Sequence, residues 1–282
     1  MHILGRIWDN LARLGFFWRL SIKSLILIGT TVGVLFPNPV LLIKQLLVYR
    51  HTESLIQTDF DGLERINQEL DALVPAHATQ EQEFQAVQRY VYDHIPYAYD
   101  WDNWLNADYW PTAAEVWERK QEDCDGRAVL ATSILRSRGF TSARLSGNIR
   151  HIWVTVGADA LMGPEPEQTI RREGGKRRIV LPSPELLLGS LAISVADFPT
   201  IRNLLLLFTV LLLCYHPCRY RAGFLGLATM ALVGFIFLKD WAGYVVKTYN
   251  TTINVDFWMG GLLLSGAIVL SCCMQTIVKR ET

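Results

Sequence analysis

Long apolar runs lie near the N-terminus and in the last third of the chain, with a polar region between them. The first run, residues 25–43, is LILIGTTVGVLFPNPVLLI and contains no charged residue. At 1.5 Å per residue, a helix of this length spans a hydrocarbon core of about 30 Å. No cleavage motif of a signal peptide follows it, so we predict an uncleaved transmembrane anchor. Three more transmembrane helices are predicted at about 201–215, 222–238 and 257–278.

In the polar region at 44–200, the spacing of apolar residues is typical of helices in the first part and of strands in the part that follows. Apolar positions recur at steps of three and four over four segments, 56–74, 81–93, 113–120 and 124–138. This spacing is typical of helices that bury one face. Alternating patterns at 140–147 and 150–156 predict two strands. We therefore predict an α+β domain of helices packed on an antiparallel sheet, together with about four transmembrane helices.

The composition narrows the classes of partner. The chain has 282 residues, with 27 basic and 27 acidic side chains and a net charge of zero, and half of its residues are hydrophobic. This apolar content excludes intrinsic disorder. The balanced charge gives no electrostatic reason to expect a nucleic acid. A membrane-embedded protein is the expectation, and the sequence contains no Gly-rich phosphate loop or zinc-ligand pairing that would indicate a cofactor.

Basic residues beside the predicted spans indicate which side of the membrane the polar domain occupies. They lie in the leader 1–24, in the loop 215–221 and in the tail 279–282, as Arg6, Arg13, Arg19, Lys23, Arg219, Arg221, Lys279 and Arg280. Cytoplasmic segments are enriched in Lys and Arg. We expect a multi-pass protein of the cell membrane whose domain at 44–200 lies on the extracytoplasmic side. Alternatively, Pro37 and Pro39 turn the first segment back as a re-entrant hairpin, which leaves the domain in the cytoplasm.

Three other segments have open interpretations. An aromatic and acidic run at 95–111 contains four possible calcium ligands, Asp100, Asp102, Asn103 and Asp108. It lacks the glycine and closing glutamate of an EF-hand, so we predict a surface loop and no metal. The basic run at 171–178 predicts a solvated hairpin, or a contact with anionic lipid headgroups or an acidic substrate. The segment 182–198 is a candidate interfacial helix.

Cys124 is the candidate nucleophile, because it is the single cysteine of the polar domain. The other four cysteines lie in or beside the predicted spans, as Cys214, Cys218, Cys272 and Cys273. Cys124 opens the helical pattern at 124–138, and a helix N-terminus stabilises a thiolate and lowers the pKa of its thiol. The N–H groups there can also hold an oxyanion. His151, at the start of the next strand pattern, is the candidate base of a Cys–His pair.

The segment AAEVWERKQEDCDGRAVLATSILRSRGFTSARLSG, followed by HIWVTV, resembles the transglutaminase-like core of the papain-like cysteine hydrolases. The resemblance covers about residues 84–170. It implies a helix that begins with the nucleophile Cys124, packed on an antiparallel sheet that carries His151 as general base and later acid. The family also places an acidic residue on the strand after the histidine, where it orients the imidazole.

The chain departs from the family at this third residue, because Gly163 stands where the acid is expected. A turn near 157–158 would bring residues 163–165 opposite His151, so Glu165 is the best substitute for the orienting residue. Glu167 and Asp159 are weaker ones, and Asp159 lies in the turn itself.

The expected activity is hydrolysis of a peptide or isopeptide bond through a thioester on Cys124. Two alternatives remain open at this stage. One is amine transfer to a protein glutamine, which is a crosslinking reaction. The other is a non-catalytic domain of the same fold that binds a peptide or a partner protein, and the missing acid favours it.

Overall fold

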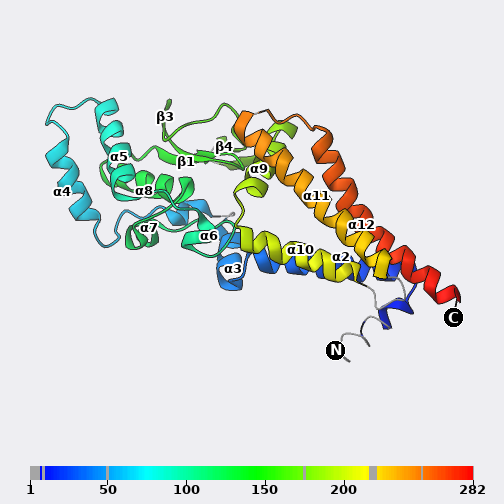
Figure 1. Cartoon of the computed structure of the whole chain (residues 1–282). Coiled ribbons are helices and arrows are strands. Elements are labelled where there is room, and N and C mark those ends of the chain that lie inside the picture. Colours follow the sequence, from blue (N-terminus) through cyan, green and yellow to red (C-terminus); the bar gives the residue numbers. More distant parts are fainter. Residues whose placement is uncertain are drawn as a thin grey trace. The chain divides into compact units, whose positions relative to one another are not determined.

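The computed structural model describes residues 7, 10–48, 51–173, 176–215, 221–248 and 250–281, apart from the side chains of 170–179, 221 and 275–281. The chain divides into two compact units. The membrane unit consists of Met1–Leu35 and Pro184–Thr282, and the polar unit is Phe36–Ser183. The described elements are mainly helices, and a small antiparallel sheet lies in the polar unit (Figure 1).

The membrane unit is a group of apolar helices. Three of them are long and apolar enough to span a membrane, namely α2 (Phe16–Leu35), α11 (Arg221–Thr248) and α12 (Val255–Glu281). The helices α9 (Pro184–Asp197) and α10 (Thr200–Cys214) meet at 99° and make a fourth span if the pair is a single broken one. The chain is therefore a membrane-associated protein, with three or four candidate spans among the described residues.

The first span differs from the predicted segment 25–43. Helix α2 begins nine residues earlier, at Phe16, and ends at Leu35. The helical pattern stops there because Pro37 and Pro39 cannot donate a backbone hydrogen bond and disfavour helical geometry in the residues before them. A separate helix, α3 (Pro39–Val48), follows and belongs to the polar unit.

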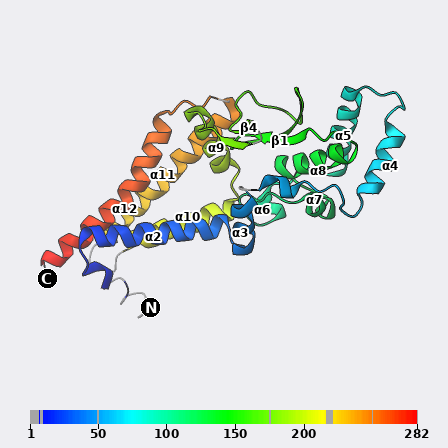
Figure 2. The ribbon, with the colours of Figure 1, turned by 180° about the vertical axis from the view of Figure 1, so that it is seen from behind.

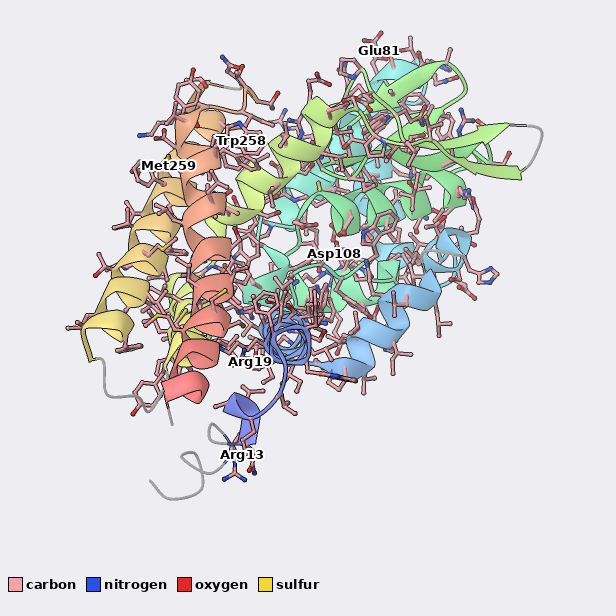
Figure 3. All side chains as sticks on the ribbon, turned by 90° about the vertical axis from the view of Figure 1, so that its right-hand side faces the viewer. Arg13, Arg19, Glu81, Asp108, Trp258 and Met259 are labelled. Atoms are coloured by element: carbon pink, nitrogen blue, oxygen red, sulfur yellow. The ribbon has the colours of Figure 1, made fainter. Side chains whose placement is uncertain are left out.

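A contact inside the membrane unit explains how the charged residue Lys23 of α2 is tolerated there. Lys23 is fully buried, and its Nζ donates a 2.7 Å hydrogen bond to Ser271 Oγ of α12. Figures 1 and 2 show that the N-terminal end of α2 and the C-terminal ends of α10 and α12 lie at the same end of this unit. Figure 3 shows Arg13 and Arg19 at that end and Trp258 and Met259 at the other. Basic residues concentrated at one end and aromatic residues at an interface are both typical of a membrane-spanning group.

The polar unit is built around α8 (Cys124–Ser137), which packs against β1 (Ala143–Gly147) and β2 (Ile152–Val156). Helices α5 (Gln80–His94) and α7 (Ala113–Arg119) pack against α8. The described strands follow the order β3-β2-β1-β4-β5. β1, β2 and β3 (Asp159–Leu161) form an antiparallel meander, while β4 (Ile170–Glu173) joins β1 through one residue pair and forms a hairpin with β5 (Lys176–Ile179).

The predicted helices over α5, α7 and α8 and the two predicted strands are confirmed, and so is the turn after β2, where Gly157 has φ +62°. The pattern at 56–74 is helical only from α4 (Leu63–Leu73), because Gly62 with φ +92° interrupts it. The aromatic run contains a four-residue helix, α6 (Asp100–Asn103). The basic run forms β4 and β5, and its side chains lie outside the described residues. The coarse prediction of helices on an antiparallel sheet with membrane helices is thus confirmed.

Candidate active site

Cys124 lies at the N-terminus of α8, where the helix meets the start of β2. The Asp123 side chain caps the helix by accepting a 3.1 Å hydrogen bond from the Asp125 N–H. The Cys124 sulfur accepts a hydrogen bond from the backbone N–H of Ile152, the first residue of β2. The thiol is therefore adjacent to the segment that carries His151.

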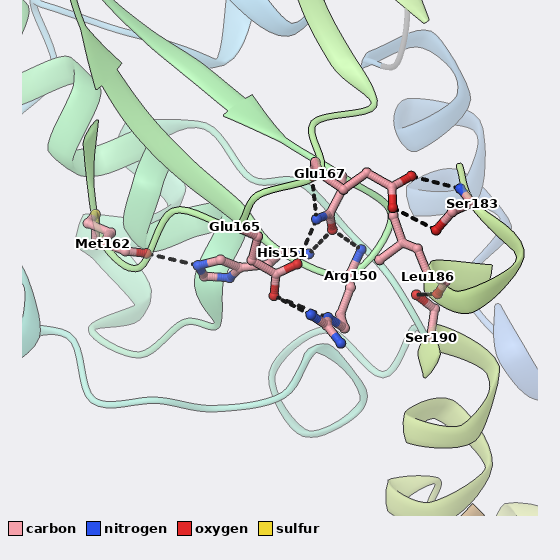
Figure 4. Close-up of polar contacts among 9 residues, drawn as sticks. Arg150, His151, Met162, Glu165, Glu167, Ser183, Leu186 and Ser190 are labelled. Atoms are coloured by element: carbon pink, nitrogen blue, oxygen red, sulfur yellow. Dashed lines mark hydrogen bonds and ion pairs between the residues drawn. The ribbon is translucent and has the colours of Figure 1, made fainter. Parts of the chain in front are cut away.

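His151 is fixed through its backbone and through its ring. Asn148 Oδ1 accepts hydrogen bonds from the N–H groups of Arg150 (2.8 Å) and His151 (3.0 Å). The Nε2 atom of His151 lies 2.8 Å from the carbonyl oxygen of Met162, as Figure 4 shows. A carbonyl can only accept, so Nε2 carries the proton. In the neutral ring Nδ1 is then free of a proton and can accept one.

Glu165, the predicted orienting acid, is bound elsewhere. Its Oε2 accepts a 2.7 Å hydrogen bond from Asn148 Nδ2, and its Oε1 forms a 2.7 Å ion pair with Arg150 (Figure 4). Glu165 thus braces the turn that leads into His151, and the Met162 carbonyl takes the place at the imidazole that we predicted for Glu165.

The two weaker candidates for the orienting acid, Glu167 and Asp159, also lie away from the His151 ring. The Glu167 carboxylate accepts hydrogen bonds from the Ser183 N–H and hydroxyl, at 2.7 and 2.6 Å. Asp159 pairs with Val156 across the β2–β3 hairpin, which puts it about 16 Å along the strand from His151 at 3.3 Å per residue. Neither carboxylate orients the imidazole in this arrangement.

Four carboxylates gather beside Cys124 and form what we call the acidic cluster, consisting of Asp100, Glu122, Asp123 and Asp125. One oxygen of each lies within 4.8 Å of the others. Glu122 accepts hydrogen bonds from Asn103 Nδ2 at 2.7 Å and from the Trp104 indole, so its charge is partly compensated. Asp100 and Asp125 are each only 3% exposed, and each has one carboxylate oxygen with no hydrogen-bond partner among the described residues.

Burial and mutual repulsion favour the neutral acids in this cluster. Burial, followed by the charge of Asp123, raises the pKa of Glu122 to about 7 and that of Asp100 to about 10. The same two causes raise the pKa of Asp125 well above its usual range. Such crowded acids need a proton or a cation to neutralise them.

The acidic cluster also raises the pKa of the candidate nucleophile Cys124, in the direction opposite to our prediction. Burial, and then the charge of Asp123, raise the pKa of the Cys124 thiol, and the Ile152 N–H lowers it by less. The helix N-terminus alone predicted a lowered pKa, but burial and the charges of Asp123, Asp100 and Asp108 outweigh it. The raised pKa favours the neutral thiol, which a base would have to deprotonate before Cys124 could act as a nucleophile.

The acidic cluster is the set of residues that could hold a metal ion. Carboxylate oxygens are ligands of hard cations such as Ca²⁺, at 2.3–2.6 Å from the ion, and the two unpartnered oxygens of Asp100 and Asp125 are available for that role. Of the four possible calcium ligands noted in the sequence, Asp100 alone belongs to this cluster. Asp108 accepts a hydrogen bond from Gln45, and Asn103 donates to Glu122.

An aromatic surface adjoins the site on the strand-like segment before α6. Tyr97 pairs with Glu122 in an isolated bridge, and its ring contacts Tyr99, which stacks on Trp101. Tyr97 is 52% exposed and Tyr99 is 36% exposed. Exposed aromatic rings beside a buried thiol are suited to hold an extended chain or a flat group.

Comparison with known proteins adds no assignment, because the chain matches no protein-family model, no curated protein and no solved structure. The geometry itself allows one chemistry directly. A thiol at a helix N-terminus can attack a carbonyl carbon when a base takes its proton, and His151, in the segment adjacent to Cys124, is the candidate base.

Proposed function

We propose that the chain is a membrane-anchored, transglutaminase-like cysteine hydrolase with a papain-like core, and that it acts on an amide bond of a peptide or protein. The observation that carries the proposal is the meeting of Cys124 with the start of β2. There the sulfur accepts from Ile152 N–H, and the adjacent His151 donates through Nε2, which leaves Nδ1 as a base.

In the proposed reaction, His151 Nδ1 takes the thiol proton as the Cys124 sulfur attacks the amide carbon. A tetrahedral oxyanion forms, and N–H groups at the start of α8 are suitably placed donors for it. The C–N bond then breaks, the imidazolium gives its proton to the leaving amine, and a thioester remains. Water attacks the thioester with His151 again as base, and it releases the acid and restores the thiol.

The raised pKa of Cys124 fits proton transfer during the attack better than a standing thiolate–imidazolium pair. It also favours a second candidate function. A domain that binds a peptide through Tyr97 and Tyr99 without cleaving it would carry a neutral thiol for the same reason.

An amine in place of water would convert hydrolysis into crosslinking, and both outcomes require the same thioester.

The labelling rate of Cys124 separates the enzyme from the binding domain. Purified full-length protein in detergent is treated with iodoacetamide, and labelling is measured on the peptide that contains Cys124. We expect His151→Ala to slow this labelling about 100-fold, because general-base assistance contributes 10²–10⁴. His94→Ala is the matched control, since the His94 ring contacts the Tyr90 carbonyl in the same unit. Equal, slow rates in wild type and His151→Ala would leave the binding function.

We further propose that the polar unit lies on the extracytoplasmic side. The support is that the N-terminal end of α2 and the C-terminal ends of α10 and α12 lie at the same end of the membrane unit. The three basic segments of the sequence flank these helix ends, and basic segments are typical of the cytoplasmic side. A membrane-impermeant maleimide applied to intact cells should label a Cys124-containing peptide. Labelling that requires permeabilised cells, for a protein whose Cys124 reacts in detergent, would reverse this orientation.

A further inference from the structure

The loop after β3 contains two consecutive residues in the left-handed region, and they face the His151 ring. Met162 has φ +67° and Gly163 has φ +74°. Glycine adopts this conformation freely, but methionine does so at an energetic cost, so something must hold Met162 there. The result of the conformation is that the Met162 carbonyl points at His151 Nε2, at 2.8 Å (Figure 4).

Helix α5 supplies the contact that holds Met162. Gln88 Oε1 accepts a 2.8 Å hydrogen bond from the Met162 N–H, across 74 residues of sequence. Met162 itself is buried, with 4% exposure. Its two backbone polar groups are thus both used, one toward α5 and one toward the imidazole. A shift of the peptide at Met162 would break either or both of these bonds.

Gly163 stands beside the same nitrogen. A Cβ atom built on Gly163 would lie 3.5 Å from His151 Nε2. A side chain at this position would therefore reach the ring, whereas the chain has none and uses the preceding carbonyl instead. A carbonyl can fix the tautomer as a carboxylate does, but it carries no full charge to stabilise an imidazolium.

We infer that the Met162 carbonyl, held in place by Gln88, is the group that orients the catalytic imidazole of this chain in place of a carboxylate. The inference rests on the proposed function, in which His151 is the base, and it makes Gln88 a positioning residue on an element that carries no other part of the site. Glu165 supports the same histidine from the opposite side, through Asn148 and the backbone.

Nitrogen NMR of the full-length protein in detergent, labelled with ¹⁵N-histidine, measures the ring tautomer without any substrate. The His151 signals are assigned by their loss in His151→Gln. At mildly alkaline pH we expect wild type to show the Nε2–H tautomer. In Gln88→Ala the signals should move toward a mixture of tautomers. Gln88→Glu keeps an acceptor oxygen and should restore the wild-type signals.

The control is Gln85→Ala, one turn earlier on α5, because Gln85 is exposed and donates to Glu81. Its His151 spectrum should match that of wild type. An Nδ1–H tautomer in wild type would overturn the inference. A His151 spectrum that is unchanged in a folded Gln88→Ala variant would overturn it as well.

Iodoacetamide labelling of Cys124 gives a second measurement, made on variants whose folding has been confirmed by circular dichroism. We expect Gln88→Ala to slow labelling about tenfold, as loss of a group that orients a functional histidine typically does. Gly163→Asp should supply a carboxylate to the ring, since aspartate tolerates a positive φ. The double variant Gln88→Ala/Gly163→Asp should then label at the rate of Gly163→Asp alone. A tenfold difference between these two would contradict the inference.

The two measurements also distinguish failure of the inference from failure of the proposed function. A Gln88-dependent Nε2–H tautomer with an unreactive Cys124 would remove the hydrolase proposal and keep the orienting contact. A reactive Cys124 that depends on His151 but not on Gln88 would keep the hydrolase and remove the orienting contact.

Discussion

The two units of the chain both bury charged groups, and they satisfy them differently. In the membrane unit, Lys23 donates to Ser271, and Lys239 donates to the carbonyls of Val195 and Ala196 at the end of α9. In the polar unit, four carboxylates lie together, and Asp100 and Asp125 each keep an unpartnered oxygen. The buried Lys23 and the half-buried Lys239 have neutral acceptors within the fold, whereas the acids repel one another.

The difference indicates two roles for buried charge. A charge that has acceptors within the fold contributes to helix packing, and its loss is expected to lower stability. Acids without enough donors depend on something outside the fold, either a proton or a cation. Because the acidic cluster adjoins Cys124, its state of charge also sets how readily the thiol loses its proton.

The largest expected effect is that of a divalent cation on the polar unit. If Ca²⁺ binds the acidic cluster, a concentration 100-fold above Kd should stabilise the protein by about 2.7 kcal/mol, or a rise in Tm of about 8 °C for a unit of this size. Asp125→Asn should abolish the rise, and the control Asp102→Asn, at an exposed position of α6, should keep it. An equal rise in wild type and Asp125→Asn would show that Ca²⁺ binds elsewhere.

The next effect is the dependence of stability on pH in the presence of a chelator. The folded-state pKa values of Glu122 and Asp100, about 7 and about 10, exceed their usual values of 4.5 and 3.8. At a pH between the unfolded-state and folded-state pKa values of each acid, the folded protein binds a proton at that acid and the unfolded protein does not. Stability is therefore full below about pH 4 for these groups and falls as pH rises toward 7 and beyond.

We expect wild type to lose at least about 2 kcal/mol of unfolding free energy between pH 5 and pH 9 from this linkage, and Asp100→Asn to lose clearly less. Denaturant unfolding at a series of pH values measures both. A wild-type stability that increases with pH over this range would mean that the acids are ionised and compensated in the folded protein.

A smaller effect is expected in the membrane unit. Ser271→Ala removes the acceptor of the buried Lys23 Nζ and should cost about 1 kcal/mol, as polar contacts between membrane helices do. Ser265→Ala is the control, because the Ser265 hydroxyl is exposed and bonds to Gly261 in its own helix. Thermal unfolding in detergent compares the two variants. Equal losses would remove the structural role that we assign to the Lys23–Ser271 contact.

The smallest effects concern the carboxylates around β2. Glu165→Gln weakens the brace on Asn148 and should slow Cys124 labelling by iodoacetamide about threefold, because the backbone bonds to His151 remain. Asp159→Asn should leave the rate unchanged. A loss of 100-fold or more in Glu165→Gln would restore Glu165 as the orienting residue.

The features that the sequence predicted are those carried by local periodicity. The pattern from Cys124 onward contains a complete helix with its glycine stop, and the alternation around Trp153 contains a complete strand, so both could be located. The start of α2 could not be located, because Lys23 breaks the uncharged run and its partner Ser271 lies 248 residues away.

The parts of the site that sequence reasoning missed depend on the backbone or on distant segments. The Met162 carbonyl has no side-chain signature, and a positive φ at methionine is not visible in a sequence. Gln88 lies on a helix predicted for other reasons. Asn148 could have been identified from the sequence, since Gly147–Asn148 is a typical turn pair between two strands. The acidic cluster joins Asp100 to residues more than 20 positions later, so only the fold brings it together.

The most direct test of the central claim is acylation of Cys124 by a simple acyl donor. Full-length protein in detergent is mixed with p-nitrophenyl acetate, and nitrophenolate release is followed together with acetylation of the Cys124 peptide. We predict a burst close to one nitrophenolate per chain, with a hydroxylamine-sensitive acetyl group on Cys124. The burst should be absent in Cys124→Ser and strongly slowed in His151→Ala. A wild-type burst that survives Cys124→Ser, or acetylation of Cys124 at the same rate in His151→Ala, would contradict the Cys124–His151 pair.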